Sequence, residues 1–475
     1  MSISQRRRAK ELISMDIEVF VTPGLGDNSF LLTSGDEAVV VDPQRDAWRF
    51  LAAADQRRAR VRAVLETHVH NDYVSGAHEI RDAHGAELVL PADGGYEFAH
   101  RGAREGEEVR VGDLRIVAIE TPGHTFEHVA WLVYEGDSPE PVALFSGGSL
   151  LVGSAGRTDL AGPENTDALT RHQYETVRRL GALPASVQLL PTHGAGSFCV
   201  SSMPSTSRTS TLGAELRSND MLLAGSLEEF EGELTGELMA YPAYYASMAG
   251  LNRAGVPVLR RTPELATLSV EAAAAAMERG VVVVDARDRD AFAAAHVPGS
   301  VNIELNSGFG SYVGWMFGFG TPTLLVLPDE EGAAAEAATQ LLRIGWPMPE
   351  GVLAGGVEAW AAAGRDVRTY RTAGPQELCD ELSSGRSPVV LDVRQPLEWQ
   401  WGVVPDSRKL FVADLPARLP EVPTDAPVWI VCSNGHRAAI AASLLDGAGG
   451  EPVLVGSGGV GEVLRMCRER QPAPA

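Results

Sequence analysis

Two histidines and an aspartate alternate with other residues in the segment His68-Val69-His70-Asn71-Asp72. The apolar run 61–65 just before them predicts a buried strand, so their side chains project from the rigid edge of a sheet. Imidazole and carboxylate are the usual protein ligands of a catalytic first-row metal. The alternative interpretation is a surface loop that holds two histidines by chance.

Two further histidines follow predicted strands in the same half of the chain. His124 comes after the run 114–119 and His193 after 187–190, and each stands beside Gly or Pro, where a turn carries a side chain to a rim. Three histidine motifs at strand ends favour a metal site over chance. The candidate metal ligands are therefore His68, His70, Asp72, His124 and His193.

A second kind of chemistry is indicated near the C-terminus, in the loop Cys432-Ser433-Asn434-Gly435-His436-Arg437. The loop joins a predicted strand at 428–431 to a predicted helix at 438–445. Backbone N–H groups and the helix dipole make such a loop a cradle for an anion, and Arg437 adds a full charge. This setting favours a thiolate and a terminal persulfide anion. Cys432 and Arg437 are the predicted catalytic residues, with Ser433, Asn434, Gly435 and His436 around the substrate; the alternative is a buried structural cysteine.

The second half of the chain repeats itself. Asp285-Ala286-Arg287 closes one predicted strand, and Asp392-Val393-Arg394 closes another about a hundred residues later. Alternating strands and helices at this spacing predict two small parallel α/β domains. The first copy carries Asp329-Glu330-Glu331 where the second has its cysteine loop, and these carboxylates would repel an anionic sulfur donor. We expect the first copy to be an inert spacer; its aromatic segment 309–319 packs either in its own core or against a neighbour.

The histidine motifs resemble those of the metallo-β-lactamase fold, most closely the glyoxalase II and persulfide dioxygenase branch. The resemblance covers residues 14–255. Both repeats resemble rhodanese domains, over 262–370 and 374–468, and the six residues from Cys432 to Arg437 match the loop length of sulfurtransferases. The expected architecture is α/β: an N-terminal αββα sandwich followed by two rhodanese-like parallel domains.

Two positions depart from the metallo-β-lactamase pattern. Tyr73 stands where the family has a further histidine, and Gly148 stands where it has an aspartate shared by two metals. The resemblance then implies at most one divalent metal, iron or zinc, on His68, His70 and His124. An aspartate introduced at 148 is expected to restore a carboxylate ligand. Asp42 either braces the metal loop through hydrogen bonds or simply ends a strand.

Together the two resemblances predict a sulfur-handling enzyme. Cys432 would carry sulfane sulfur from thiosulfate or a small persulfide to a thiol, and the first domain would oxidise or hydrolyse a persulfide. One alternative is a metal-dependent thioester hydrolase of the glyoxalase II type with accessory rhodanese domains. Another is a sulfur carrier whose first domain binds no metal and catalyses nothing.

Composition limits the partners. The 475 residues carry a net charge of −23, which argues against a nucleic-acid partner because phosphates demand a basic surface. No apolar run approaches the roughly 18 residues of a membrane span, so we expect a cytoplasmic protein, with a homo-oligomer left open. The cysteines Cys199, Cys379, Cys432 and Cys467 show no paired spacing, which predicts reduced thiols; Cys199 is expected to be packed, not a nucleophile.

Overall fold

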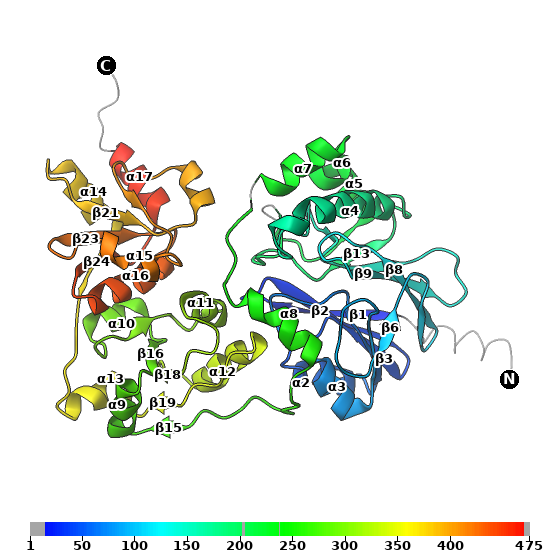
Figure 1. The fold of residues 1–475 in the computed structure, drawn as a ribbon, viewed down its shortest axis with the longest axis horizontal. Coiled ribbons are helices and arrows are strands. Elements are labelled where there is room, and N and C mark those ends of the chain that lie inside the picture. Colours follow the sequence, from blue (N-terminus) through cyan, green and yellow to red (C-terminus); the bar gives the residue numbers. More distant parts are fainter. Residues whose placement is uncertain (1–14, 202–204, 237, 470–475) are drawn as a thin grey trace, which may run out of the picture. The chain divides into compact units, whose positions relative to one another are not determined.

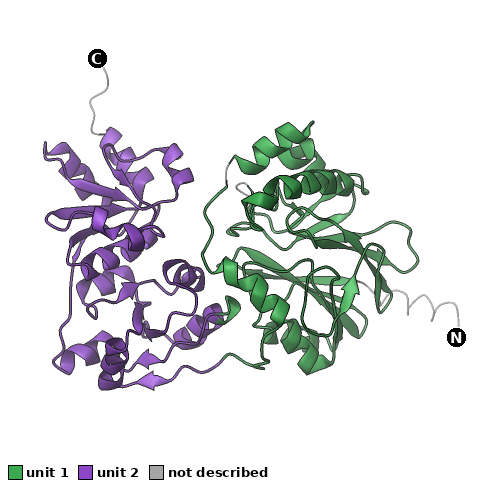
Figure 2. Ribbon diagram, in the orientation of Figure 1, with its two compact units in different colours: residues 1–262, 342–345 green, residues 263–341, 346–475 purple. Residues whose placement is uncertain are grey.

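The computed structural model describes residues 15–201, 205–236 and 238–469. The chain divides into two compact units, residues 1–262 with 342–345 and residues 263–341 with 346–475 (Figure 2).

The described part of the first unit contains two six-stranded sheets. In the first sheet β1 to β3 are antiparallel and β3 to β6 are parallel; in the second, β10 and β13 are parallel and the other pairs antiparallel. A short hairpin, β11 (Leu150–Leu151) and β12 (Ser154–Ala155), follows the second sheet's strand β10. The strands in spatial order are β1 (Asp16–Thr22), β2 (Asp27–Ser34), β3 (Glu37–Val41), β4 (Arg60–Leu65), β5 (Glu87–Pro91) and β6 (Arg101–Ala103), then β14 (Ser210–Thr211), β13 (Gln188–Pro191), β10 (Ala143–Gly147), β9 (Val129–Glu135), β8 (Leu114–Glu120) and β7 (Glu108–Val111).

Helices cover the outer face of each sheet (Figure 1). Side chains alternate along a strand, so Phe30 of β2 faces the second sheet while Leu31 faces the helices. Phe30 meets Phe145 across the inner core with ring centroids 5.0 Å apart. The outer helices are α2 (Trp48–Gln56) and α3 (Ala77–His84) on the first sheet, and α4 (Pro163–Gly181), α5 (Leu212–Ser218), α6 (Asp220–Leu223) and α7 (Leu227–Thr235) on the second; α8 (Tyr245–Ala254) ends the unit. The αββα sandwich predicted from the sequence is thus confirmed.

The second unit contains the two repeats, and both have one topology. Each described sheet is parallel and has five strands in the order first, fifth, fourth, second, third. The first copy comprises β15 (Thr267–Leu268), α9 (Val270–Glu278), β16 (Val282–Asp285), α10 (Arg289–Ala294), β17 (Val301–Asn302), α11 (Phe309–Met316), β18 (Thr323–Val326), α12 (Ala333–Arg343), β19 (Val352–Leu353) and α13 (Gly356–Ala362). The second comprises β20 (Arg371–Ala373), α14 (Pro375–Ser383), β21 (Val389–Asp392), η1 (Pro396–Trp401), β22 (Arg408–Lys409), α15 (Leu415–Arg418), η2 (Leu419–Glu421), β23 (Pro427–Val431), α16 (His436–Gly447), β24 (Glu451–Val455) and α17 (Val460–Glu469).

The repeated Asp-x-Arg motif has the same role in both copies. Asp285 binds Arg287 through both carboxylate oxygens, and Asp392 binds Arg394 likewise. In the second copy the guanidinium also donates to the carbonyl of Gly402, which ties the end of β21 to the loop before β22. These buried pairs explain why the motif recurs: it fixes the loop at the carboxyl end of a central strand.

The expectation of four reduced thiols was wrong for two of them. Cys379 of α14 and Cys467 of α17 form a disulfide, with Cα atoms 5.5 Å apart. The two residues lie 88 positions apart in the sequence, so their spacing concealed the pairing. Cys199 and Cys432 are free and buried.

The predicted domain limits remain partly open. Residue 14, the expected start of the first domain, lies outside the described residues. The two repeats cluster in one compact unit although the sequence suggested two domains. In the described part of the chain, no helix has the length and apolar character needed to cross a membrane.

Candidate functional site

The candidate metal ligands lie where strands of the first unit end. His68, His70 and Asp72 follow β4, His124 follows β8, and His193 follows β13. Parallel neighbours β3 and β4, and β10 and β13, bring their carboxyl ends to one edge of the sandwich. All five side chains are buried.

Three of the imidazoles converge. One ring nitrogen from each of His68, His124 and His193 lies within 4.8 Å of the other two. The Nε2 atoms of His68 and His193 are 3.4 Å apart. The Nε2 of His124 is buried and has no hydrogen-bond partner among the described residues.

The opposite nitrogens of His124 and His193 carry the protons. Nδ1 of His124 lies 2.7 Å from the carbonyl oxygen of Arg157, which only accepts, so the nitrogen donates. Nδ1 of His193 lies 2.9 Å from Oδ1 of Asp27 and donates to that carboxyl. In both rings Nε2 is therefore left with a lone pair.

Asp42 fixes the tautomer of His68 through Thr67. The Asp42 carboxylate accepts from the Thr67 backbone N–H at 2.7 Å and from its hydroxyl at 2.8 Å, and also from the Thr192 hydroxyl. Since the Thr67 hydroxyl has given its proton to Asp42, its oxygen accepts from Nδ1 of His68 at 2.9 Å. The bracing interpretation of Asp42 is thus confirmed, and His68 also presents a lone pair on Nε2.

The electrostatics keep the trio neutral. Burial lowers the pKa of His68 and of His124 to well below the ordinary value, and the neighbouring imidazoles lower both further. Burial also lowers the pKa of His193, although Asp72 opposes it. Three lone pairs directed at one buried point repel one another unless a cation lies between them, so this donor set fits a divalent metal.

His70 is directed elsewhere. Its Nε2 lies 2.8 Å from Oε2 of Glu66 and 3.0 Å from the hydroxyl of Tyr73, and its ring stacks on that of Tyr73. Burial alone would lower its pKa, but Asp42 and Glu66 hold the pKa of His70 well above the ordinary value. The structure thus groups His193, and not His70, with His68 and His124. Nδ1 of His70 is buried and has no hydrogen-bond partner within the described part of the chain.

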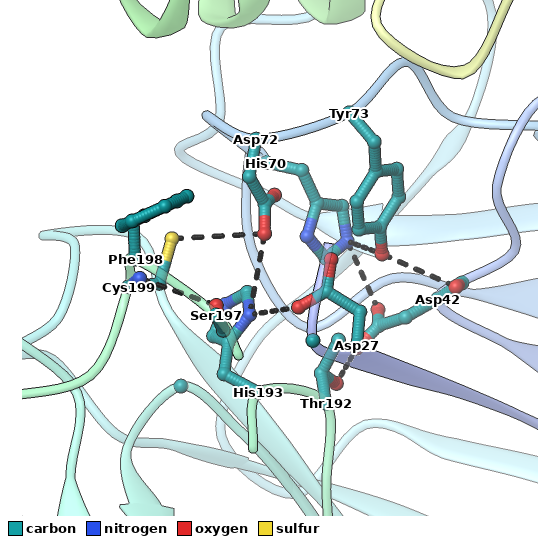
Figure 3. A network of polar contacts seen from close by, with 12 residues as sticks. Asp27, Asp42, His70, Asp72, Tyr73, Thr192, His193, Ser197, Phe198 and Cys199 are labelled. Carbon is teal, nitrogen blue, oxygen red and sulfur yellow. Dashed lines mark hydrogen bonds and ion pairs between the residues drawn. The ribbon is translucent and has the colours of Figure 1, made fainter. Parts of the chain in front are cut away.

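Asp72, the remaining candidate ligand, lies beside His193 (Figure 3). Oδ2 of Asp72 is 3.3 Å from Nδ1 of His193 and 3.6 Å from Sγ of Cys199. Burial raises the pKa of both Asp27 and Asp72 to about 7. Burial also raises the pKa of the Cys199 thiol well above its ordinary value, which fits a packed residue and not a nucleophile.

Gly148 has no room for a side chain. Its N–H donates to Nε2 of His128 at 2.9 Å, and this draws the loop against His124. A Cβ at position 148 would lie 2.2 Å from Cδ2 of His124. The expectation that an aspartate at 148 restores a ligand is therefore wrong for this backbone, because the substitution displaces a histidine of the trio.

A cleft opens beside the loops that follow His70 and His124. It has a volume of about 990 Å³. Its walls combine aromatic rings with a pair of opposite charges, a lining that suits a small organic molecule with ionised groups. The residues on it include Asn71, Phe126, Glu127, Tyr241, Tyr245 and Arg253.

The thiol site lies in the second unit, between β23 and α16. Cys432 directly follows β23, and its side chain is almost fully buried. The backbone N–H of Gly435 donates to its Sγ at 3.1 Å. Gly435 has a φ of 91°, a conformation that favours glycine and lets the loop curl around the sulfur. The backbone N–H of His436 donates to Oδ1 of Asn434 at 3.2 Å and closes the turn.

Arg437 is paired and does not present a free charge. Both of its terminal nitrogens contact the carboxylate of Glu398, Nη2 at 2.8 Å, and Nη2 also donates to the hydroxyl of Ser433 at 2.8 Å. Burial by itself would lower the pKa of Arg437, but Glu398 raises it above the usual range. The prediction that Arg437 supplies net positive charge to the pocket is therefore corrected: the guanidinium holds the loop in place.

The corresponding region of the first copy is an acidic hollow of about 1460 Å³. Arg287, Leu327, Asp329 and Glu330 are among its lining residues, and none of them is a cysteine. These acidic lining residues agree with the prediction that the first copy lacks a sulfur-transfer centre. It stays a prediction until transfer is measured.

Comparison with known proteins agrees with both halves of this geometry. Residues 22–193 match the metallo-beta-lactamase superfamily, and residues 269–363 and 375–465 each match the rhodanese-like domain. A hydroxyacylglutathione hydrolase from Cereibacter sphaeroides is 33% identical over 189 residues, 38% of this chain and 67% of that protein. The chain belongs to the metallo-beta-lactamase superfamily. Two rhodanese-like domains follow its metallo-beta-lactamase domain.

Two further relatives define the extent of the match. A human hydroxyacylglutathione hydrolase-like protein is 32% identical over 180 residues, and the match spans 37% of this chain and 59% of that protein. A metallo-beta-lactamase structure from Staphylococcus aureus subsp. aureus COL superposes with a TM-score of 0.65 at 24% identity, over 71% of this chain and 99% of that one. The structural likeness supports the fold.

Several residues of the two sites were not found from the sequence. Glu66 and Thr67 precede the histidine motif directly, so their closeness to His68 was a usable signal. Glu398 of the second rhodanese-like domain, and Arg289 and Glu304 of the first, lie far from Cys432 in sequence. No local pattern marks them, and only the fold brings them to the thiol loop.

Proposed function

We propose that the chain is a sulfurtransferase that carries sulfane sulfur on Cys432. The hydrogen bond from the Gly435 N–H to Sγ supports this proposal most directly, because a donor aimed at a buried sulfur stabilises an anion there. The first turn of α16 adds its dipole at the same point. A merely structural cysteine needs neither feature.

The proposed transfer has two steps. The Cys432 thiolate attacks the outer sulfur of thiosulfate; an S–S bond forms, the S–S bond of thiosulfate breaks, and sulfite leaves with the electron pair. A nucleophile, either a small thiolate or cyanide, then takes the terminal sulfur and regenerates the thiolate. The Gly435 N–H stabilises the thiolate form of Sγ, and Ser433 and Asn434 border the exposed mouth of the loop.

Mass spectrometry tests this function. After incubation with thiosulfate, we expect the protein to gain one sulfur atom on Cys432, and Cys432→Ser to lose both the gain and thiosulfate-to-cyanide transfer. Cys199→Ser is the matched control, because Cys199 is also free and buried. Sulfur found on Cys199, or transfer by Cys432→Ser, would exclude the proposal.

We propose further that the metallo-beta-lactamase domain binds one divalent metal, iron or zinc, through His68, His124 and His193. Either metal would supply Lewis acidity and an activated water for the hydrolysis of a thioester. Iron, unlike zinc, would also supply the redox chemistry by which dioxygen, as the oxidant, oxidises a persulfide. The Thr67 hydroxyl, itself bound to Asp42, accepts the Nδ1 proton of His68, and the carbonyl of Arg157 accepts that of His124. The neighbouring cleft holds the substrate. The substrates proposed for the whole chain are a small thiol or persulfide and thiosulfate.

Two assays separate oxidation from hydrolysis. With glutathione persulfide, oxygen consumption would support oxidation. With a hydroxyacylglutathione thioester, release of the thiol without oxygen consumption would support the hydrolase alternative, which the names of the curated relatives favour. If the metal-loaded protein shows neither activity, the chain is a sulfur carrier with an inactive first domain.

A further inference from the structure

The first rhodanese-like domain touches the sulfur loop of the second through Arg289. This arginine begins α10, just after the Asp285 strand end. Its Nη1 donates to the carbonyl oxygen of Asn434 at 2.7 Å and to that of Gly456 at 3.0 Å. One guanidinium thus binds two separate loops of the other domain at the site of Cys432.

The contact with Asn434 bears directly on the catalytic sulfur. The carbonyl of Asn434 and the N–H of Gly435 belong to one peptide group, which is planar and trans, so they point in opposite directions. Arg289 holds the carbonyl end at 2.7 Å, and the N–H end donates to Sγ of Cys432 at 3.1 Å. The arginine of one domain therefore sets the direction of the donor that faces the sulfur in the other.

Close packing makes this orientation stiff. A Cβ at position 435 would lie 2.0 Å from Nη1 of Arg289 and 2.3 Å from the carbonyl oxygen of Gly456. Only a glycine therefore fits at position 435 between the guanidinium and the Gly456 carbonyl, so Arg289 packs directly on the loop.

A carboxylate of the first domain holds Arg289 in place. Glu304 accepts from Nε at 2.9 Å, from Nη2 at 2.6 Å and from the Arg289 backbone N–H at 3.2 Å. The same carboxylate lies 3.0 Å from Nδ1 of His436. Arg289 and Glu304 therefore bind Asn434 and His436, the residues on either side of Gly435.

Aromatic contacts extend the interface. The ring of Tyr312 of α11 packs edge-on against His436 with centroids 4.6 Å apart, and Trp315 packs against Phe411 at 5.4 Å. Of the two expectations for the segment 309–319, packing against a neighbouring domain is thus borne out for these two rings.

We propose that Arg289 is a positioning residue for sulfur transfer, so that the rhodanese-like domain without a cysteine completes the active site of the domain that has one. This inference rests on the proposed sulfurtransferase function. The inert domain is then more than a spacer: it aligns the peptide N–H that stabilises the Cys432 thiolate and its persulfide.

The test compares Arg289→Met, which keeps the bulk and removes the donors, with Arg289→Lys, which keeps one donor. The matched control is Arg279→Met, since Arg279 lies in the same domain and, among the described residues, pairs with the exposed Glu350 away from the sulfur loop. The first readout is the pH profile of alkylation of Cys432 by iodoacetamide, located by mass spectrometry. The second is the thiosulfate-to-cyanide rate, divided into kcat and KM.

We expect Arg289→Met to move the alkylation profile to higher pH by about one unit and to lower kcat about tenfold, the effect of losing one well-aligned hydrogen bond to an anion. Arg289→Lys should lie between Arg289→Met and the unaltered protein, and Arg279→Met should match the latter. The other ionisable groups around the sulfur loop, Arg437, Glu398, Tyr312, His436 and Glu304, are the same in all these variants.

An alkylation profile of Arg289→Met that coincides with that of the unaltered protein would overturn the inference. If Arg289→Met does not fold, Glu304→Gln replaces it, because it weakens the hold on Arg289; it must shift the profile in the same direction. The alkylation readout needs no sulfur donor. A protein that takes no sulfur from thiosulfate but shows the shift would refute the proposed function and leave the positioning role of Arg289 intact.

Discussion

The Nε2 atoms of His68 and His193 face each other at 3.4 Å inside the metallo-beta-lactamase domain. Each ring donates from its other nitrogen, His68 to Thr67 and His193 to Asp27, so neither Nε2 holds the proton that a hydrogen bond between them would need. Nε2 of His124 is a third unprotonated ring nitrogen beside them, so the pocket offers three lone pairs to a cation.

The first prediction concerns metal content. We expect one divalent metal per chain, and His124→Ala and His193→Ala should each remove it, because two imidazoles do not hold the ion against competing buffer. Elemental analysis of the purified protein measures this directly. His172→Ala is the control, since His172 lies on α4 and belongs to none of the metal-ligating clusters. Two tightly held metals per chain would contradict the prediction.

A second prediction follows from the packing of Gly148 on His124. Gly148→Ala should destabilise the domain by about 1–3 kcal/mol, the usual cost of overpacking, and should lower metal content together with stability. Gly148→Asp should cost at least as much. Urea unfolding and elemental analysis measure the two effects. Gly232→Ala is the control, because nothing lies within 4 Å of the added Cβ. An aspartate variant with higher metal content would show that the loop rearranges.

A third prediction concerns the pair of Arg437 and Glu398. Arg437→Met leaves the Glu398 carboxylate unpaired with a side chain only 14% exposed, which should cost about 3–5 kcal/mol. The double variant Arg437→Met with Glu398→Gln should recover much of that loss. A double-mutant cycle by urea unfolding measures the coupling. The exposed pair of Arg418 and Glu421 serves for comparison and should show little coupling. Additive single effects at Arg437 and Glu398 would mean that the buried pair is not coupled.

The sequence predicted those parts of the molecule that depend on local pattern. The strand before His68, the helix over residues 438–445 and the repeat of Asp285 and Asp392 follow from periodicity and punctuation, and the structure has all of them. The parallel α/β class of the two repeats followed from alternating strands and helices. The αββα sandwich followed from the resemblance to the metallo-β-lactamase fold.

Side-chain direction was not available from the sequence. His70 follows the same strand as His68, yet Glu66 and Tyr73 draw it away from the trio, and no spacing rule reports this. Arg437 looked like a free charge because Glu398, its partner, stands 39 residues earlier. The disulfide of Cys379 and Cys467, and the grip of Arg289 on Asn434, likewise arise from packing between distant segments.

The last prediction is the acid sensitivity of the Glu304 contact. Burial alone would raise the pKa of Glu304, but the hydrogen bond to His436 and the pair with Arg289 lower it to about 2. A carboxyl whose pKa falls on folding stabilises the native state fully above its unfolded pKa, about 4.3, and loses that contribution as the pH falls toward 2.

The side chain of Glu304 is 11% exposed, so screening is slight, and the contribution at neutral pH is about 3 kcal/mol. Urea unfolding of the unaltered protein and of Glu304→Gln should therefore differ equally at pH 7 and pH 5.5, and by about 1 kcal/mol less at pH 3.5. Glu350→Gln, which removes the exposed partner of Arg279, is the control for a surface ion pair and should show only a small difference. A Glu304→Gln difference that stays constant down to pH 3.5 would mean that Glu304 is not the ionised partner of Arg289 and His436.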